Sequence, residues 1–526
     1  MTLRKRLITI LIIALCAGGI YAVGHLGLTV RQSEEMQAEE DSLFGRRETL
    51  YLWYTDEALS DYLNSVAVAY SEYQDEVRVI PVYTSGREYL ETVNQASLHT
   101  EEVPDLYIVS NDSLEKAYLS GLASEVKLPD GVLSMQENFP ETAVHAVTYH
   151  DKQIAYPFYF ETSCFLYNLT YLEDWARAQI EAQQDVAAEA AQQKIDNGQE
   201  DADAEDDAEG AQENADAGGE EADAVENDAE EAGGISEDAV NDRVLQVLPD
   251  TIDDILTFAD EYDAPEQVEA VFKWDVSDIF YNYFFVGDAI DVGGVNGDQA
   301  DAIHIYNEDA IKCMRVYQDL NQFFSIDTKE ISYDGVLQDF MDGKIVYTVA
   351  TSDALSKIET AKAEGNFAYE YGVSVLPDVS EELSSASLSV TQCVVVNGYS
   401  VKKEMANDFA VYLTEYASDT LYARTGKLPV NNRNDTYEDA NRAAFWQEYM
   451  NSVPMPKMVE TSNFWVELEI AFARIWSGED ANQDLKGLSE KIMAQVVGGE
   501  YTEEYIDVPE EVVEEYVDEE EAEGEE

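Results

Sequence analysis

One carboxylate stands inside a long apolar run of this sequence. Glu161 interrupts the stretch at 156–168, which reads YPFYFETSCFLYN. A carboxylate costs several kcal/mol when it is buried without a partner. The fold or a ligand must therefore supply a partner for Glu161.

Other side chains able to bind or react follow the ends of predicted strands. Trp53 lies at the end of the first strand, and Asn111 and Asp112 follow the third. In an open α/β sheet, ligands bind beyond the carboxyl ends of the strands, so these residues are expected at one rim. Paired carboxylates such as Asp112 and Glu161 also have the chemistry of an acid and a base for glycoside hydrolysis.

Strands and helices alternate in the segment that carries these residues. The predicted elements, strand first, are 50–54, 56–73, 78–83, 87–98, 105–110 and 113–121. The first helix has an apolar face at helical spacing, made by Leu59, Tyr62, Leu63, Val66 and Tyr70. Strand–helix–strand units of this length indicate parallel strands joined by right-handed crossovers in an α/β fold. A later helix is predicted at 247–262, with Asp250 or Thr251 as its N-cap.

The chain is strongly acidic. Its 526 residues carry a formal net charge of -78, with 18 acids and no base in 200–238 and 15 acids and no base in 500–526. Once these 33 charges are set aside, the rest of the chain still carries about -45. A field of this sign repels phosphates, so a nucleic acid partner is excluded. The length is sufficient for two or three domains.

Cysteines and histidines give no sign of a metal or cofactor site. Cys164, Cys313 and Cys393 are widely spaced, form no CxxC pair, and are expected to be buried thiols. The five histidines lack ligand spacing, and the sequence contains no GxSxG, HExxH or P-loop pattern. No cofactor is expected, and an enzyme is not favoured.

The N-terminus indicates export. The basic start MTLRKR precedes an apolar run of 24 residues at 7–30, enough for a helix to cross a bilayer of about 30 Å. Residues 1–30 are predicted to be an uncleaved membrane anchor, and residues 31–47 a polar tether. Cleavage after 22–24 and lipidation of Cys16 are the alternatives.

Two segments are too acidic and too poor in apolar residues to order themselves. Between 176 and 245 the composition reduces mainly to Ala, Glu, Asp, Gly and Gln, although the first part fits the extension of a helix. High like charge without apolar periodicity predicts a disordered insertion in a surface loop. The tail at 500–526 is predicted to be solvated coil, with weak docking through Val512, Val513 and Tyr516. Calcium buffering or partner binding is the alternative role of both segments.

Six motifs occur in an order that resembles one protein family. They read VPDLYIVSND…YLSGLASEV, IAYPFYFETSCFLYN, LQDFMDGKIVYTVATSDALSKI, YEYGVSVLP, RTGKLPVNNR and VPMPKMVETSNFWVELEIAFARIWSG. In register over 48–497, they resemble the extracellular solute-binding proteins of ABC importers, of the maltose-binding-protein type. The acidic insertion alone interrupts the resemblance.

The resemblance implies a two-lobed, periplasmic-binding-protein-like α/β fold with a ligand cleft between the lobes. The segments that cross between the lobes would fall near 156–162 and 387–397. The implied lobes are an N-terminal lobe at 48–160 and 392–430, and a C-terminal lobe at 161–175, 246–391 and 431–499. The insertion at 176–245 and the tail at 500–526 lie outside both lobes.

Matching positions imply a sugar site in this cleft. In the first lobe, at the hinge and near the C-terminus they are Trp53, Glu57, Asp112, Glu161 and Trp465. In the second lobe they are Trp274, Asp275 and Tyr281. Carboxylates accept hydrogen bonds from paired hydroxyl groups, and indole rings cover the apolar face of a pyranose. Glu161 would emerge into the cleft, where a bound solute rather than a buried salt bridge supplies its partners.

The sequence departs from the maltose-type pattern at four positions. The pattern has aromatic or basic residues where this chain has Ala58, Val109, Ser113 and Asp353. Stacking surface and hydrogen-bond donors are lost, while acids are kept or added. The departures imply a different sugar, or a cationic or metal-bearing solute drawn to the acids Glu57, Asp112, Glu161 and Asp353.

Three of these residues also have purely structural roles open to them. Trp465 fits packing in a core, and Trp53 fits a wedge between a strand end and a helix. Asp112 fits an N-cap, a role that would stabilise its helix by about 1 kcal/mol.

The predicted function is capture of a small solute, first of all a carbohydrate, in a cleft that closes over it. A monomer would deliver the solute to ABC permease subunits at the extracellular face of the membrane. A surface sensor that presents the closed form to a receptor kinase is one alternative. An exported glycoside-acting enzyme is the other.

Overall fold

The computed structural model describes residues 47–86, 88–99, 103–129, 131–200, 235–324, 326–433, 435–461 and 463–509. The predicted membrane segment, almost all of the tether, the middle of the insertion and the docking residues predicted in the tail lie outside these ranges. Within the described ranges, no helix has both the length and the apolar character needed to cross a membrane.

Three parallel strands form the sheet of the N-terminal lobe. They are β1 (Glu48–Tyr54), β2 (Val77–Tyr83) and β3 (Leu106–Ser110), hydrogen-bonded in the order β2-β1-β3. Alternate side chains of β1 are buried, namely Leu50, Leu52 and Tyr54. The predicted strands and their parallel direction are confirmed.

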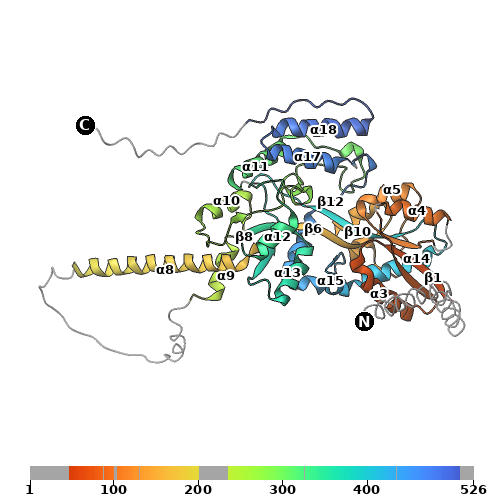
Figure 1. Ribbon diagram of the computed structural model, residues 1–526, viewed down its shortest axis with the longest axis horizontal. Helices are drawn as coiled ribbons and strands as arrows, with labels where there is room; N and C mark the ends of the chain where they lie inside the picture. The colour runs from red at the N-terminus through yellow and green to blue at the C-terminus, as the bar shows by residue number, and fades with distance from the viewer. Residues whose placement is uncertain are drawn as a thin grey trace, which may run out of the picture.

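Helices cover both faces of this sheet (Figure 1). On one face, α3 (Ser60–Tyr73) buries the side chains that its spacing predicts, Tyr62, Leu63, Val66 and Tyr70. The helices α4 (Tyr89–His99) and α5 (Leu114–Leu119) pack with β3 in a separate apolar cluster that includes Val93 and Leu114. Their positions match the predicted helices to within two residues at each end.

Two long antiparallel strands connect the lobes. The first half of β6 (Tyr156–Asn168) pairs with β10 (Leu388–Val396), and its second half pairs with strands of the C-terminal lobe. Because β10 also pairs with β3, one sheet runs through both lobes in the order β2-β1-β3-β10-β6-β8-β7. The segments predicted to cross between the lobes fall on β6 and β10.

The C-terminal lobe continues this sheet and surrounds it with helices. Its strands are β7 (Ala270–Phe272), β8 (Ile345–Thr351) and β9 (Tyr371–Ser374). Its helices are α10 (Ile252–Glu261), α11 (Glu308–Phe324), α12 (Tyr333–Met341), α13 (Asp353–Glu364), α17 (Phe464–Trp476) and α18 (Ala481–Val497). Thr251 caps α10 in a capping box with Asp254, so one of the two predicted N-caps is confirmed.

Shorter elements complete the body. They are α6 (Met135–Asn138), α7 (Glu141–Val147), β4 (Thr148–Tyr149), β5 (Lys152–Gln153), α14 (Lys403–Val411), α15 (Leu421–Thr425), β11 (Leu428–Pro429), α16 (Ala440–Asn451) and β12 (Val453–Pro454). In Figure 1, α15 lies between α3 of the N-terminal lobe and α13 of the C-terminal lobe. Directly after α15, β11 pairs with β6 at Tyr159 and Phe160, which brings this segment back to the crossing strands.

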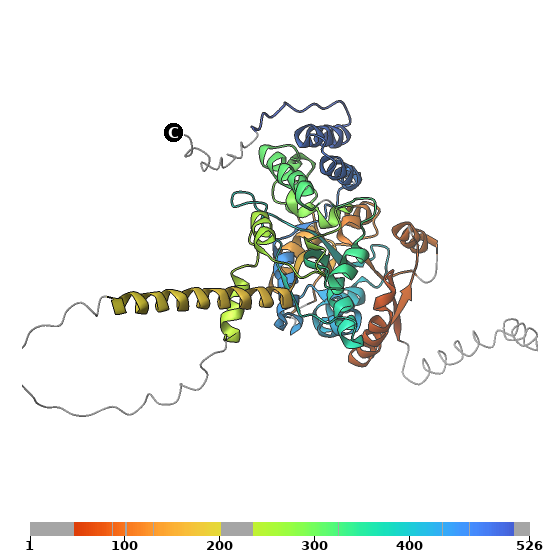
Figure 2. The ribbon, with the colours of Figure 1, turned by 60° about the vertical axis from the view of Figure 1, so that its left-hand side comes forward.

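The predicted insertion begins and ends in helices. α8 (Leu169–Glu200) projects from the C-terminal lobe, and α9 (Glu237–Leu245) packs beside its base (Figures 1 and 2). The helical extension at the start of the insertion is confirmed, whereas disorder up to residue 245 is wrong. α9 is ordered because Ser236 caps it and its apolar pair, Val240 and Val244, is buried.

The first part of the predicted tail packs on the C-terminal lobe. The guanidinium of Arg315 in α11 donates to the carbonyls of Val508 and Pro509 at 2.9 Å, and the side chain of Val508 is buried. The boundary placed at residue 500 was therefore too early. Counting acids missed this packing because backbone groups and the side chains of Val508 and Glu503 make the contact, with the Glu503 carboxylate accepting from the hydroxyl of Ser489 at 2.6 Å.

Candidate functional site

A cavity of about 720 Å³ lies between the lobes at the crossing strands. The N-terminal side of its wall is formed by Ala58 and the turn at 425–427. The C-terminal side is formed by 278–281, Tyr333 and the residues where β8 leads into α13. Glu161, Leu388 and Val390 of the crossing strands also line it. A solute in this cavity would contact both lobes at once.

Glu161 lies in this cleft, but the protein itself supplies a partner. Its Oε1 accepts a hydrogen bond from Nζ of Lys427 at 2.9 Å, and its side chain is 40% exposed. The prediction that a solute takes the place of a salt bridge is therefore wrong. The two residues meet because β11, which begins directly after Lys427, pairs with β6 at Phe160.

Lys427 holds two carboxylates together. Its Nζ also lies 3.1 Å from Oδ2 of Asp56 and 5.5 Å from the ring centre of Tyr159. Burial alone would lower the pKa of Lys427, but the attraction of Glu161 and Asp56 outweighs it and raises the pKa. The amine therefore stays charged and balances one of the two negative charges at this wall.

The opposite wall repeats this arrangement. Lys357 pairs with Asp353 at 2.8 Å and with Asp334 at 2.9 Å, and its Nζ lies 4.9 Å from the ring centre of Tyr333. Asp353 also accepts hydrogen bonds from Thr351 at 2.5 Å and from Tyr333 at 2.6 Å. Burial would raise the pKa of Asp353, but the hydrogen bonds from Lys357, Thr351 and Tyr333 outweigh it and lower the pKa. Asp353 is a fixed, ionised acceptor at the cleft.

Aromatic rings provide the apolar surface of the cleft. Tyr281 stacks on Tyr333 with ring centres 4.8 Å apart and 15° between the ring planes. Burial raises the pKa of both phenols, which keeps them as neutral hydrogen-bonding groups. Trp465 lines the same cavity and packs edge-on against Tyr283. Of the residues predicted to bind the ligand, the structure brings together Glu161, Tyr281, Asp353 and Trp465.

The other second-lobe candidates lie in the core. Trp274 is fully buried, stacks on Phe272 and donates its indole N–H to Asn282 at 2.8 Å. Asp275 is also buried, and its carboxylate accepts from the backbone N–H and the hydroxyl of Ser277. Both side chains have their hydrogen bonds within the protein, which corrects their assignment as ligand contacts.

The first-lobe candidates lie beside the cleft and do not line it. Glu57 is exposed, and its neighbour Asp56 is the acid that reaches Lys427. Trp53 packs against the cluster formed by α4, α5 and β3. Asp112 accepts a hydrogen bond from Ser110 and is exposed, and no side chain caps α5 through a hydrogen bond. The N-cap role considered for Asp112 is therefore not observed either.

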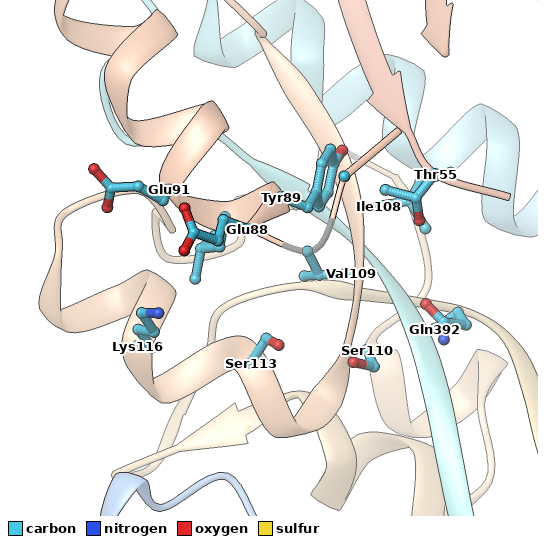
Figure 3. A pocket seen from close by; sticks show the side chains of 12 residues that line it. Thr55, Glu88, Tyr89, Glu91, Ile108, Val109, Ser110, Ser113, Lys116 and Gln392 are labelled. Atoms are coloured by element: carbon cyan, nitrogen blue, oxygen red, sulfur yellow. The ribbon is translucent and has the colours of Figure 1, made fainter. Parts of the chain in front are cut away.

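A second cavity, of about 600 Å³, lies beyond the carboxyl ends of β1 and β3. The sheet topology predicts a ligand position at this rim. In Figure 3, Glu88 and Glu91 lie on one side of the cavity, and Lys116 and Ser113 lie on the other. The N-terminal lobe supplies its lining together with Gln392 of β10, so this cavity lacks a wall from the opposite lobe.

The described residues contain no group of three or more histidine, cysteine, aspartate or glutamate side chains placed to hold a metal ion. Cys164, Cys313 and Cys393 are free and buried, as predicted. Desolvation raises the pKa of all three thiols, so they are poor nucleophiles.

The model of the bacterial extracellular solute-binding proteins matches residues 66–451, which is more than half of the chain. This chain belongs to the bacterial extracellular solute-binding proteins. The family predicted from the six motifs is thus confirmed. No curated protein matches this solute-binding protein in sequence.

Solved structures share the fold. The extracellular solute-binding protein of Staphylococcus aureus, solved with maltose, gives a TM-score of 0.62 at 15% identity, covering 86% of this chain and 98% of its own. The maltose-binding periplasmic protein of Listeria monocytogenes, also solved with maltose, gives a TM-score of 0.60 at 20% identity. The match covers 86% of this chain and 99% of the Listeria chain. These likenesses establish the two-lobed fold of maltose-binding proteins for this solute-binding protein.

Sequence reasoning missed the cations of the cleft. Lys427 stands in the motif RTGKLPVNNR, which carries the family resemblance, but nothing in the sequence marks its contact with Glu161, 266 positions away. Lys357 follows Asp353 by four positions in a helix, a spacing that brings side chains together, and this signal was available. The family resemblance pointed to the adjacent Glu57, so the ion pair of Asp56 with Lys427 was not predicted.

Proposed function

We propose that this protein captures a neutral carbohydrate in the cleft between its lobes and delivers it to an ABC permease. The observation that carries the proposal is the cavity between the lobes, where stacked tyrosines and a tryptophan face carboxylates that are already paired with lysines. Aromatic faces suit the C–H surface of a sugar ring, and fixed carboxylates suit its hydroxyl groups.

The ion pairs support one of the two kinds of solute that the sequence left open. Three acids line the cleft, and two of them, Glu161 and Asp353, have a lysine within 2.9 Å. The third, Asp278, is exposed and accepts from the backbone N–H of Phe280. A cationic solute would have to displace these amines or bind beside them, at a Coulombic cost. A neutral polyol can accept from the lysines and donate to the carboxylates without disturbing either pair. This chemistry favours a sugar over an amine or a metal complex.

The solved neighbours support a sugar as well, since those from Staphylococcus aureus and Listeria monocytogenes hold maltose. Ala58 and Asp353, which depart from the maltose-type pattern, line the cleft, so the preferred sugar is expected to differ from maltodextrin. The other two departures, Val109 and Ser113, line the cavity at the rim of β1 and β3. Extracellular placement follows from the family, and the N-terminal apolar run is proposed as the anchor.

Binding is proposed to close the cleft. A solute that touches both walls favours the closed form by its difference in affinity for the two forms. The crossing strands β6 and β10 are the connections on which the lobes would move. A monomer with closed lobes is then the form that a permease recognises.

A thermal-shift screen of the full chain against neutral sugars, amines and divalent ions tests the proposal, with calorimetry on each hit. At least one neutral sugar should raise the melting temperature. Trp465→Ala should weaken its binding about ten-fold, equivalent to about 1.4 kcal/mol. Tyr73→Ala, which removes a 71% exposed ring on α3, is the matched control and should bind like wild type.

The proposal would be contradicted by a hit confined to amines or divalent ions. Turnover of a bound sugar would instead establish an enzyme. Wild-type affinity in Trp465→Ala would show that the sugar binds elsewhere, for example in the cavity at the rim of β1 and β3.

A further inference from the structure

Two helices from different lobes touch beside the cleft. α15 packs on α3 of the N-terminal lobe, and α13 follows β8 of the C-terminal lobe. A Cβ placed on Gly426, at the end of α15, would lie 3.1 Å from both Cβ and Oγ of Ser356 in α13. That separation is closer than ordinary contact between such atoms, so the absence of a side chain at Gly426 lets the lobes come this close.

Ser356 has little freedom to move aside. Its Cβ is bonded directly to the helix backbone and moves only with it. Its hydroxyl donates to the carbonyl of Asp353 at 3.0 Å. One helical turn further on, the hydroxyl of Tyr422 in α15 donates to Glu359 of α13 at 3.1 Å. Arg442 lies 3.7 Å from the same carboxylate. These polar contacts hold the two helices side by side, so extra volume at Gly426 must move a helix.

The contact lies close to the crossing strands. Gly426 is two positions before Leu428, which pairs with Phe160 of β6. Each contact residue is followed in sequence by a cleft lysine, Lys427 in one lobe and Lys357 in the other. Near a hinge, a small displacement at the contact becomes a larger one at the mouth of the cleft.

We propose that Gly426 is a positioning residue that sets how closely the lobes approach, with Ser356 as the surface on which it stops. The inference rests on the proposed function in one respect: a sugar would be enclosed when the lobes approach each other. A side chain at Gly426 acts as a wedge, holds the walls apart and weakens any binding that needs both walls.

The chain offers a matched control for the backbone. Gly426 ends α15 with φ +72°, and Gly365 ends α13 with φ +75°. A Cβ on Gly365 would have no neighbour within 4 Å. Asparagine tolerates the left-handed region better than most residues, so Gly426→Asn and Gly365→Asn impose the same backbone cost. The lobe contact alone distinguishes the two variants.

The experiment measures the distance between two spin labels on the solute-free full chain. Labels at Glu57→Cys and Ser277→Cys, both exposed and next to opposite cleft walls, report the separation in a Cys16→Ser background. Gly426→Asn should lengthen the mean separation by on the order of 2 Å, and Gly365→Asn should leave it unchanged. Ser356→Gly added to Gly426→Asn should restore the wild-type separation.

Equal separations in Gly426→Asn and Gly365→Asn would overturn the inference, as would a failure of Ser356→Gly to rescue. Melting curves of both variants verify that they fold. Because this measurement needs no solute, it fails or succeeds independently of the sugar screen. A screen without hits would remove the proposed function and leave the distance result standing.

Discussion

Two lysines connect segments from different parts of this chain, and their surroundings differ in kind. Lys427 lies at the cleft, 22% exposed, between the carboxylates of Asp56 and Glu161. Lys457 is 1% exposed and donates to two backbone carbonyls, that of His145 in α7 at 3.0 Å and that of Asn296 in the C-terminal lobe. One amine has charged partners, and the other has dipoles only.

The difference decides how each amine holds its proton. Charged partners outweigh burial at Lys427, so its pKa is raised. At Lys457 burial has the largest effect and lowers the pKa. The acids Asp298 and Glu115 offset only part of this decrease, so the pKa falls from 10.5 to about 8. The comparison teaches that the cleft keeps a charged amine, paired with two carboxylates, within reach of solvent. The contact at Lys457 is built as a dry structural joint.

The largest effect is expected from removing the cleft amine. Lys427→Met leaves Asp56 and Glu161 facing each other without a cation and should lower the free energy of unfolding by about 2–3 kcal/mol. This is less than for a fully buried pair because water reaches Glu161. Urea denaturation at neutral pH measures it. Lys312→Met, which breaks an exposed pair with Glu308 on α11, is the control and should leave stability unchanged. Equal losses in the two variants would break the comparison.

A smaller effect, visible in its pH dependence, is expected at the dry joint. Between about pH 8 and pH 10 the unfolded chain binds more protons than the folded one at Lys457, so this residue makes stability rise with pH, by about 2 kcal/mol. Lys457→Met should lack this rise when wild type and variant are unfolded in urea across the range. Lys427, whose pKa is raised, gives up its contribution only above 10.5, so Lys427→Met should keep the rise. Loss of the rise in Lys427→Met would reverse the assignment.

The smallest effect is expected from neutralising one cleft acid. Glu161→Gln leaves Asp56 to hold Lys427 and keeps the shape of the side chain, so the free energy of unfolding should fall by about 1 kcal/mol or less. The same denaturation series measures this change. A loss of stability as large as that of Lys427→Met would mean that Asp56 does not contribute to holding Lys427. The site would then reduce to the single ion pair of Glu161 and Lys427.

Much of the fold could be predicted because its determinants are local. The alternation of apolar strands with amphipathic helices at 48–121 fixed the parallel sheet, and the apolar run around Glu161 marked a crossing strand. Errors arose where a few contacts outweighed composition. α9 formed within an acidic segment, and the chain at 500–509 packed on α11 although its net charge suggested coil.

The site was harder to predict because it depends on residues that are distant in sequence. Glu161, Tyr281, Asp353 and Trp465, which were selected through the family resemblance, line the cavity between the lobes. Trp274 has a residue type that suits a sugar ring and a position that matches the family's ligand contacts. Its ring is nevertheless buried in the core, where it stacks on Phe272. Residue type alone does not distinguish a ring that meets a ligand from one that meets another ring.

Small-angle scattering of the full chain with a sugar taken from the thermal-shift screen tests the central claim most directly. A solute held between two lobes should reduce the radius of gyration at saturation, and Trp465→Ala should require about ten-fold more sugar for the same reduction. An unchanged radius with the sugar demonstrably bound would contradict a closing cleft.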